Sequence, residues 1–248
     1  MNRLARICMT LAMALLWTPP NSYAAGEAGE LEPAGINIQD LAALQRGAGV
    51  FVNYCLSCHG AAYMRYNRLS EDLELSEEVV MDKLVFADAK IGEIMRIAIN
   101  EDDAERWFGQ PPPDLSLVGR SRGADWLYGY MRAFYQDQSG GWNNLLLPNA
   151  AMPHVLWQLQ GIQTPVYAET PGREKGRLVI DHLELTTPGI MTPAEYDNTV
   201  RDLVTFLDYL GEPAKLQRKN IGIWVMLFLA VFAFLAYLLK AEYWRDVD

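Results

Sequence analysis

The sequence has few of the residues from which disulfide frameworks and most metal sites are built. It contains three cysteines and three histidines among 248 residues. Cys8 lies in an N-terminal apolar segment, so the rest of the chain keeps only Cys55 and Cys58. Two thiols cannot form a disulfide framework, and no second pair exists to complete four zinc ligands. The sequence also shows no acid–base pair, activated nucleophile, phosphate-binding loop, internal repeat or low-complexity tract.

Positive charge is scarce in the central part of the chain. Residues 26–214 hold 14 Lys and Arg against 28 Asp and Glu, a formal net charge of −14. Such a surface repels nucleic acid and attracts a basic protein, whose encounter rate then depends on salt. Acidity that serves solubility alone explains the charge equally well. We therefore expect no nucleic-acid partner, and a basic protein partner is one of two interpretations.

An apolar segment lies at each end of this acidic body. Residues 1–25 begin with two arginines, continue with an apolar run and end in the small residues that a signal peptidase reads, which predicts a cleaved signal peptide. An uncleaved N-terminal anchor is the alternative, but the apolar run is short for spanning a bilayer.

The second segment, Ile221 to Leu239, has 19 residues without a charge. At 1.5 Å per residue it is roughly 28 Å long, close to the hydrocarbon thickness of a bilayer. Trp and Tyr residues near its ends fit the two membrane interfaces. We predict a transmembrane anchor at 215–240 and, because the signal peptide exports the body, a cytoplasmic tail at 241–248.

The chain is organised around Cys55-Leu56-Ser57-Cys58-His59. Two thiols three positions apart, followed at once by an imidazole, are typical of a c-type haem attachment site. Near a helical turn both thiols project to one side and can bond the two vinyl groups, and His59 can then act as the proximal ligand. A redox dithiol does not need the adjoining imidazole. We predict one covalent haem c in residues 26–214, on the periplasmic side of a bacterial inner membrane, because this haem is attached outside the cytoplasm.

Two stretches further along the chain suit the surroundings of a haem. Residues 107–116 (WFGQPPPDLS) contain three prolines, so their backbone is stiff and exposes carbonyls. One carbonyl can bind the outer imidazole nitrogen of His59 and fix the ring. Arg120 and Arg122 follow, and guanidinium groups suit haem propionates. Residues 125–135 predict an aromatic-rich helix that could wall the macrocycle or simply pack in the core.

A haem that transfers electrons normally has a second axial ligand, often methionine. Met152 is the first candidate because Pro153 follows it, and such a loop can present a thioether. His154, His182 and Met191 are rivals, and methionine is more often core filling. The residues by themselves leave this choice open.

The remaining patterns predict a mainly α fold. Residues 41–52 repeat apolar side chains at helical spacing after a capping Asp40, and Thr192 to Gly211 begins with a capping box. Packing of these two helices gives a haem domain like that of class I cytochromes c, with extra loops. Between them we expect helix, interrupted or not, from Ser76 to Ile99, an acidic loop at 101–105 and a small hairpin within 167–185.

Together these motifs resemble the cytochrome c1 family, the haem-c subunit of the cytochrome bc1 complex (ubiquinol:cytochrome c oxidoreductase). The resemblance covers nearly all of the body and the anchor. It rests on CLSCH followed by YMRYNRL, PPDLS followed by RSR, AMPHVL, and TPAEYDNTVRDLVTFLDYLGEP before a single span. It implies thioethers at Cys55 and Cys58, axial ligands His59 and Met152, Arg122 as propionate partner, and Pro113 and Tyr128 lining the haem.

The resemblance also implies a role within an enzyme complex, with no catalytic residues in this subunit. The haem takes one electron from the Rieske iron–sulfur protein and passes it to a c-type cytochrome. Cytochrome b and membrane lipid are further expected partners, in a dimeric complex. The alternatives are a free-standing, membrane-anchored electron shuttle, or a haem peroxidase or ligand sensor with an open sixth site.

Overall fold

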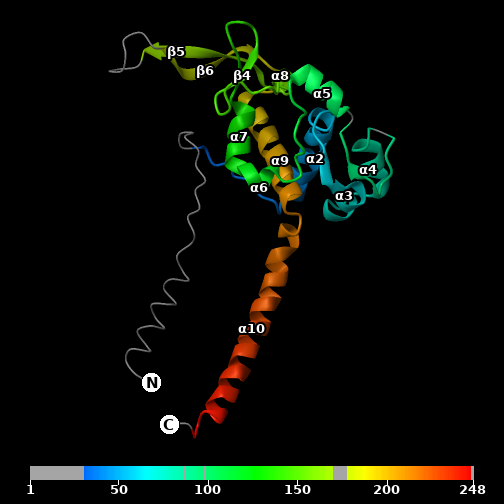
Figure 1. The fold of residues 1–248 in the computed structure, drawn as a ribbon, viewed down its shortest axis with the longest axis vertical. Coiled ribbons are helices and arrows are strands. Elements are labelled where there is room, and N and C mark those ends of the chain that lie inside the picture. The colour runs from blue at the N-terminus through cyan, green and yellow to red at the C-terminus, as the bar shows by residue number, and fades with distance from the viewer. Residues whose placement is uncertain (1–30, 87, 98, 170–177, 247–248) are drawn as a thin grey trace. The chain divides into compact units, whose positions relative to one another are not determined.

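The structure is a computed structural model that describes residues 31–86, 88–97, 99–169 and 178–246. The predicted signal peptide, 1–25, lies outside these ranges. The helices are α2 Leu41–Tyr54, α3 Tyr66–Asp72, α4 Glu77–Lys83, α5 Glu101–Phe108, α6 Val118–Arg122, α7 Ala124–Arg132, α8 Trp157–Gln160, α9 Pro193–Gly211 and α10 Lys215–Tyr243. The strands are β1 Ala61–Arg65, β2 Ile94–Met95, β3 Phe134–Gln136, β4 Trp142–Asn144, β5 Gly161–Glu169 and β6 Leu178–Pro188. Helices dominate (Figure 1), which confirms the predicted mainly α class.

The two long helices of the haem domain begin where their capping residues predict. The Asp40 side chain accepts a hydrogen bond from the Ala43 amide at 3.1 Å, which satisfies one free donor at the start of α2. At the start of α9, Thr192 and Glu195 form the predicted capping box.

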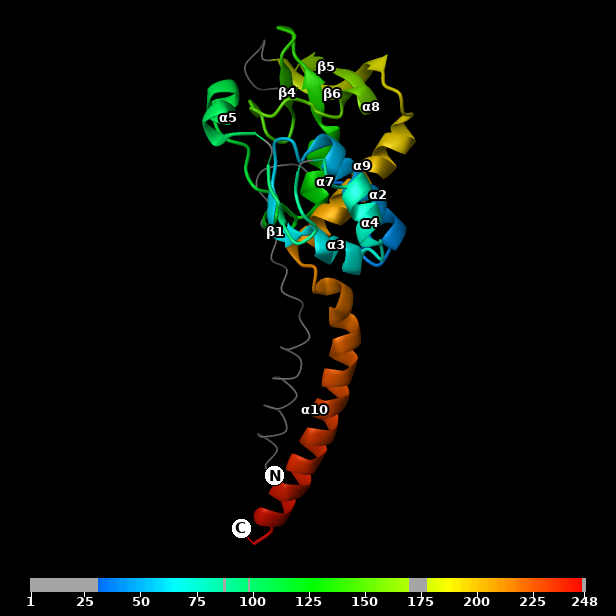
Figure 2. The same cartoon turned by 90° about the vertical axis from the view of Figure 1, so that its right-hand side faces the viewer.

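Helices α2 and α9 pack directly against each other, as predicted, and lie side by side in Figures 1 and 2. The contact is so close that a Cβ atom added to Gly47 would lie 2.1 Å from the carbonyl oxygen of Asp202. The rings of Phe51 and Phe206 are 5.5 Å apart in the same contact. Absence of a side chain at Gly47 therefore lets the two backbones approach.

The prediction of helix from Ser76 to Ile99 is wrong beyond Lys83, where α4 ends. The following residues pair with the β1 region instead: the Tyr66 amide donates to the Glu93 carbonyl at 3.1 Å, and β2 pairs with β1. Tertiary pairing has replaced the helical hydrogen bonds of this stretch.

The prediction of an acidic loop at 101–105 is also wrong, since these residues form the beginning of α5. Asn100 caps the helix by accepting from the Asp102 amide at 2.8 Å. Acidic residues in a first turn interact favourably with the helix dipole, so the same charges that suggested a solvated loop stabilise a helix start.

The aromatic stretch 125–135 is helical only as far as Arg132 and then forms β3, which pairs with β4. The hairpin expected within 167–185 is confirmed by the antiparallel pair β5–β6, which is longer than predicted.

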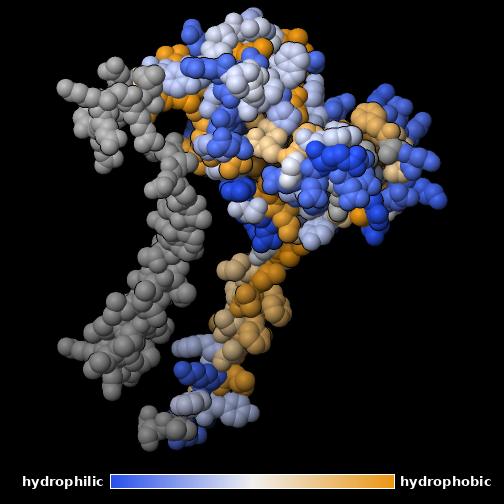
Figure 3. All heavy atoms as spheres, turned by 45° about the horizontal axis from the view of Figure 1, so that its top comes forward, coloured by the Kyte–Doolittle hydropathy of each residue, from blue (hydrophilic) through white to orange (hydrophobic). Residues whose placement is uncertain are grey.

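Helix α10 is the predicted anchor. Among the described residues it is the one helix long and apolar enough to cross a membrane, over Ile221–Tyr243, and none of that stretch is buried against the protein. Figure 3 shows its apolar side chains exposed along the helix. Within the part of the chain that the structure describes, α10 is thus the one helix that fits a membrane anchor.

Candidate haem site

The CLSCH motif forms a tight turn at the end of α2. The amides of Cys58 and His59 both donate to the Cys55 carbonyl, at 3.0 and 2.7 Å. Cys55 is buried, Cys58 is partly exposed, and both thiols are free. This turn places the two thiols and the imidazole around one site, as the motif predicts.

The imidazole of His59 is held by the proline-rich loop. Its Nδ1 lies 2.7 Å from the carbonyl oxygen of Pro113, so the predicted carbonyl contact is present. This contact leaves Nε2 as the ring nitrogen available to a metal. Burial lowers the pKa of His59, partly offset by the Pro113 carbonyl and the nearby Asp114. The ring is therefore neutral near pH 7, with a lone pair to donate.

The proline-rich loop is itself fastened to the chain just after the motif. The Asp114 carboxylate accepts hydrogen bonds from the Ala62 amide, at 2.8 Å, and the Ser116 amide, at 2.9 Å. The Leu115 amide donates to the Gly60 carbonyl at 2.8 Å. These bonds give the Pro113 carbonyl a fixed position relative to His59.

A mostly apolar cavity lies between the motif, the proline-rich loop and the loop that carries Met152. Its volume is about 90 Å³, and it opens to solvent. Its lining residues are Tyr54, Cys55, Cys58, His59, Phe108, Gln110, Pro112, Pro113, Ala151, Met152, Pro153 and Val155. Two thiols, one imidazole and one thioether within an apolar lining are the donor set that a covalently attached haem c requires, so these residues fit that group.

The Cys55 thiol does not suit the alternative of a redox dithiol. Burial raises the pKa of Cys55 to about 12, and the neighbouring Cys58 adds to the effect. Redox dithiols react through a thiolate whose pKa is lowered, which is the opposite condition.

Of the four residues considered as sixth ligand, only Met152 lines the cavity. His154 is buried elsewhere, stacked on Phe134 with ring centroids 4.9 Å apart. His182 is exposed on β6, and the Met191 sulfur accepts from the Thr199 hydroxyl at 3.5 Å. The sequence did not distinguish these four candidate ligands, whereas the structure places Met152 alone among them at the cavity.

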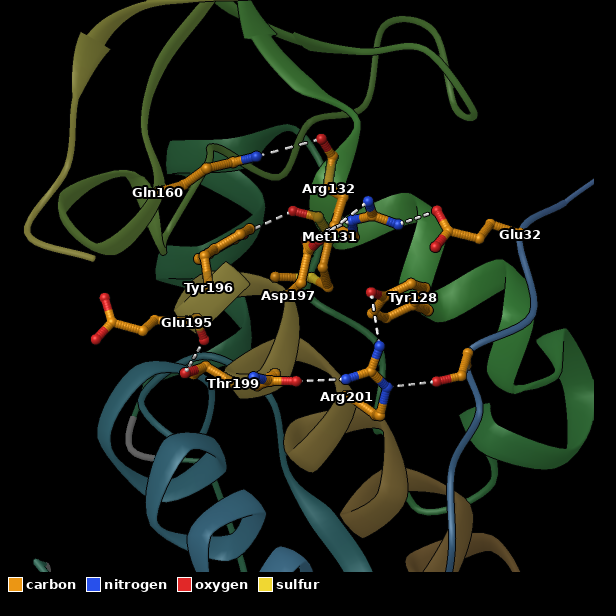
Figure 4. A network of polar contacts seen from close by, with 12 residues as sticks. Glu32, Tyr128, Met131, Arg132, Gln160, Glu195, Tyr196, Asp197, Thr199 and Arg201 are labelled. Carbon is orange, nitrogen blue, oxygen red and sulfur yellow. Dashed lines mark hydrogen bonds and ion pairs between the residues drawn. The ribbon is translucent and has the colours of Figure 1, made fainter. Parts of the chain in front are cut away.

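The structure does not bring Tyr128 to the cavity. Its hydroxyl faces the Arg201 guanidinium at 3.3 Å on the α9 side of α7, and the Arg132 guanidinium lies 4.5 Å from its ring centre (Figure 4). Positions 126 and 130 are each two residues from Tyr128. Two residues correspond to a rotation of about 200° around the helix axis, so their side chains lie on another face of α7.

The other face of α7 carries Trp126 and Tyr130, which the sequence-based predictions did not include. Arg122 at the end of α6 lies over the Trp126 ring, 4.8 Å from its centre, and Trp126 stacks on Tyr130. The Tyr130 hydroxyl in turn donates to the Met152 sulfur at 3.6 Å. Trp126 and Tyr130 follow the predicted Arg122 at intervals of four residues, and this spacing is the signal that would have found them.

This site and fold define a membrane-anchored c-type cytochrome. The model of the Cytochrome C1 family matches residues 35–247. The chain is 47% identical over 243 residues to cytochrome c1 of Allochromatium vinosum, which covers 96% of this chain and 98% of that protein. It is also 47% identical over 244 residues to a Nitrosomonas europaea protein named ammonia monooxygenase gamma subunit, covering 98% of this chain and 99% of that one. Cytochrome c1 of Rhodospirillum rubrum is 26% identical over 236 residues, 82% of this chain and 81% of that protein.

The chain belongs to the cytochrome c1 family. Members of this family carry one covalently bound haem c and are electron-transfer subunits of the cytochrome bc1 complex.

Proposed function

We propose that this subunit accepts an electron from the Rieske iron–sulfur protein and passes it to a c-type cytochrome during quinol oxidation. The observation that supports it is the single cavity that joins the CLSCH turn, the Pro113 carbonyl and Met152. Haem c, when bound, supplies a one-electron iron couple. The chain supplies its attachment, its ligands and its surroundings.

In this proposal six residues in and near the cavity have assigned roles. Cys55 and Cys58 would hold the haem through thioethers, and Nε2 of His59 and the Met152 sulfur would be its proximal and distal iron ligands. The Pro113 carbonyl orients the His59 ring and raises its basicity. Arg122, exposed beside Trp126, pairs with a haem propionate. Methionine ligation favours a high reduction potential.

We further propose that residues 26–214 lie in the periplasm after cleavage of residues 1–25. Helix α10 then lies among the lipids of the bacterial inner membrane beside cytochrome b, in a dimeric complex, and residues 241–248 are cytoplasmic. The acidic body, with its net charge of −14 between residues 26 and 214, suits a basic cytochrome as acceptor.

A free-standing, membrane-anchored shuttle is the alternative, and the junction before the anchor argues against it. Helix α9 ends at Gly211 and α10 begins at Lys215. The Lys215 ammonium is 2.7 Å from the Asp208 carboxylate, and Arg218 pairs with Glu212. A shuttle needs a long flexible linker at this place, whereas a fixed subunit suits a short junction with ion pairs across it.

The name of the Nitrosomonas relative suggests an oxygenase role. Oxygen chemistry at a haem needs an open coordination position. His59 and Met152 both line the cavity, and in this proposal they would occupy the two iron-ligand positions. Electron transfer is the function that this donor set supports.

Purification of the tagged protein from native membranes in mild detergent tests the proposal. We expect b-type haem and an iron–sulfur protein to co-purify, with quinol:cytochrome c oxidoreductase activity. Isolation of a lone haem-c protein under the same gentle conditions would establish the shuttle instead.

A further inference from the structure

The Tyr130 hydroxyl lies 3.6 Å from the Met152 sulfur, and the geometry is that of an O–H donor and a thioether acceptor. Thioether sulfur is a weak acceptor, but it keeps a second lone pair when the first binds a metal. The contact therefore does not compete with a bond between Met152 and iron.

The Tyr130 ring is held so that its hydroxyl cannot turn away. It is 8% exposed and stacks on Trp126 with centroids 4.9 Å apart at 11°. The edge of Phe134 meets the same ring at 5.0 Å and 68°. An aromatic ring packed on two sides has one position for its hydroxyl.

Asn144 fastens the Met152 loop to the backbone of the same tyrosine. Its fully buried side chain donates to the Tyr130 carbonyl at 2.8 Å and accepts from the amides of Leu146 and Leu147, at 2.9 and 3.2 Å. The loop that leads to Met152 and the residue that touches its sulfur are thus joined at two places. Such a doubly joined arrangement keeps a ligand in one geometry.

We propose that Tyr130 is a positioning residue for the sixth ligand, which orients the Met152 sulfur by a hydrogen bond and raises the reduction potential of the haem. The inference rests on the proposed role of Met152 as axial ligand. A donor to the sulfur withdraws electron density and weakens its donation to iron. Ferric iron depends on that donation more than ferrous iron does, so the hydrogen bond favours the reduced state.

The test compares Tyr130→Phe with Tyr128→Phe in the purified complex. Both variants remove one buried hydroxyl from the same helix and keep the ring, but Tyr128 bonds Arg201 rather than Met152. Three properties are measured: the midpoint potential of the haem, the far-red absorption of the ferric iron–thioether bond, and the rate of cyanide binding.

We expect Tyr130→Phe to lower the potential, shifting the equilibrium constant for reduction roughly two- to tenfold, the size of one neutral hydrogen bond. It should also alter the far-red band and speed cyanide binding, whereas Tyr128→Phe should match the unmodified protein. A Tyr130→Phe protein with unchanged potential, band and cyanide binding would overturn the inference.

Met152→Leu separates the two hypotheses. If it abolishes the far-red band while Tyr130→Phe changes nothing, only the inference about Tyr130 fails. If the band survives in Met152→Leu, the ligand assignment fails and the inference fails with it.

A second variant covers the case in which Tyr130→Phe does not assemble. Site-specific 3-fluorotyrosine at position 130 keeps the hydroxyl and makes it a stronger donor. We expect the potential to move upward, opposite to the shift in Tyr130→Phe, and an unchanged or lower value would contradict the inference.

Discussion

The Nδ1 atom of His59 lies 2.7 Å from the carbonyl oxygen of Pro113, across 54 positions of sequence. A carbonyl in a proline-rich loop cannot move far, and the Asp114 carboxylate fastens this loop to the Ala62 amide. The ring therefore has one orientation and one free nitrogen before any metal binds. In the proposed haem site, backbone contacts organise the side that carries His59, and the side chains of Met152 and Tyr130 contact each other on the side that carries Met152.

Replacement of Met152 tests the distal ligand. Met152→Leu should leave haem covalently attached, because the CLSCH turn is intact, but should lower the midpoint potential and admit cyanide or carbon monoxide. Met191→Leu is the matched control, since its sulfur bonds Thr199 and does not line the cavity. Absorption spectra and redox titrations of the two variants test this expectation. A normal spectrum in Met152→Leu would reject Met152 as the distal ligand.

Gly47 tests the crossing of α2 and α9. Gly47→Ala places a methyl group 2.1 Å from the Asp202 carbonyl oxygen, so the helices must separate. Such overpacking costs typically about 1–3 kcal/mol and here should exceed the gain in helix propensity. Gly49→Ala is the control in the same helix, because nothing lies within 4 Å of an added Cβ. Thermal unfolding should show a lower midpoint for Gly47→Ala and an equal or higher one for Gly49→Ala; equal losses in both would refute the close crossing.

His154→Phe should stabilise the protein without changing the haem. The ring is 1% exposed and stacks on Phe134, and Gln160, whose side-chain oxygen is likewise buried and unpaired, is the one polar side chain that acts on its pKa within the described residues. Phenyl has nearly the same shape and no polar atoms to desolvate, so we expect a gain of about 1–3 kcal/mol in unfolding free energy. Chemical denaturation measures the gain. A change in haem spectrum would instead show that His154 takes part in ligation.

The capping box of α9 predicts one component of acid sensitivity. The Glu195 carboxylate accepts from the Thr192 amide and hydroxyl, both at 2.8 Å, and these bonds lower its pKa below the usual 4.5. A lowered folded-state pKa means that the unfolded chain binds the proton more readily, so stability falls as pH drops through that range. Glu195→Gln should lose this dependence while retaining most of the helix. The measurement is the unfolding midpoint as a function of pH, and curves of identical slope below pH 4.5 would contradict the prediction.

Electron delivery to a basic cytochrome should fall as salt rises. The body between residues 26 and 214 has a net charge of −14, and attraction between opposite charges is screened within about 10 Å at 0.1 M salt. Stopped-flow oxidation of the reduced complex by a basic and by an acidic cytochrome c provides the comparison. A rate independent of salt for the basic partner would show that the acidity serves solubility alone.

Features that depend on neighbouring residues were predictable from the sequence. The CLSCH turn, the Asp40 cap, the Thr192 capping box and the apolar run of α10 each rest on side chains a few positions apart. Their hydrogen bonds or exposure are therefore encoded locally. The Pro113 contact to His59 was predictable for a related reason, since a stiff loop offers few carbonyls.

Only the tertiary structure decided which side chains face the cavity. Met152, His154, His182 and Met191 carry similar donor atoms, and Tyr128 and Tyr130 are chemically the same. Packing of α7 against α9 turns Tyr128 toward Arg201 and leaves Tyr130 for Met152. The stretch after Lys83 likewise gives up helix because β1 supplies its backbone partners. Contacts between segments far apart in the chain determine which of several chemically similar side chains faces the cavity. A local sequence pattern cannot predict such contacts.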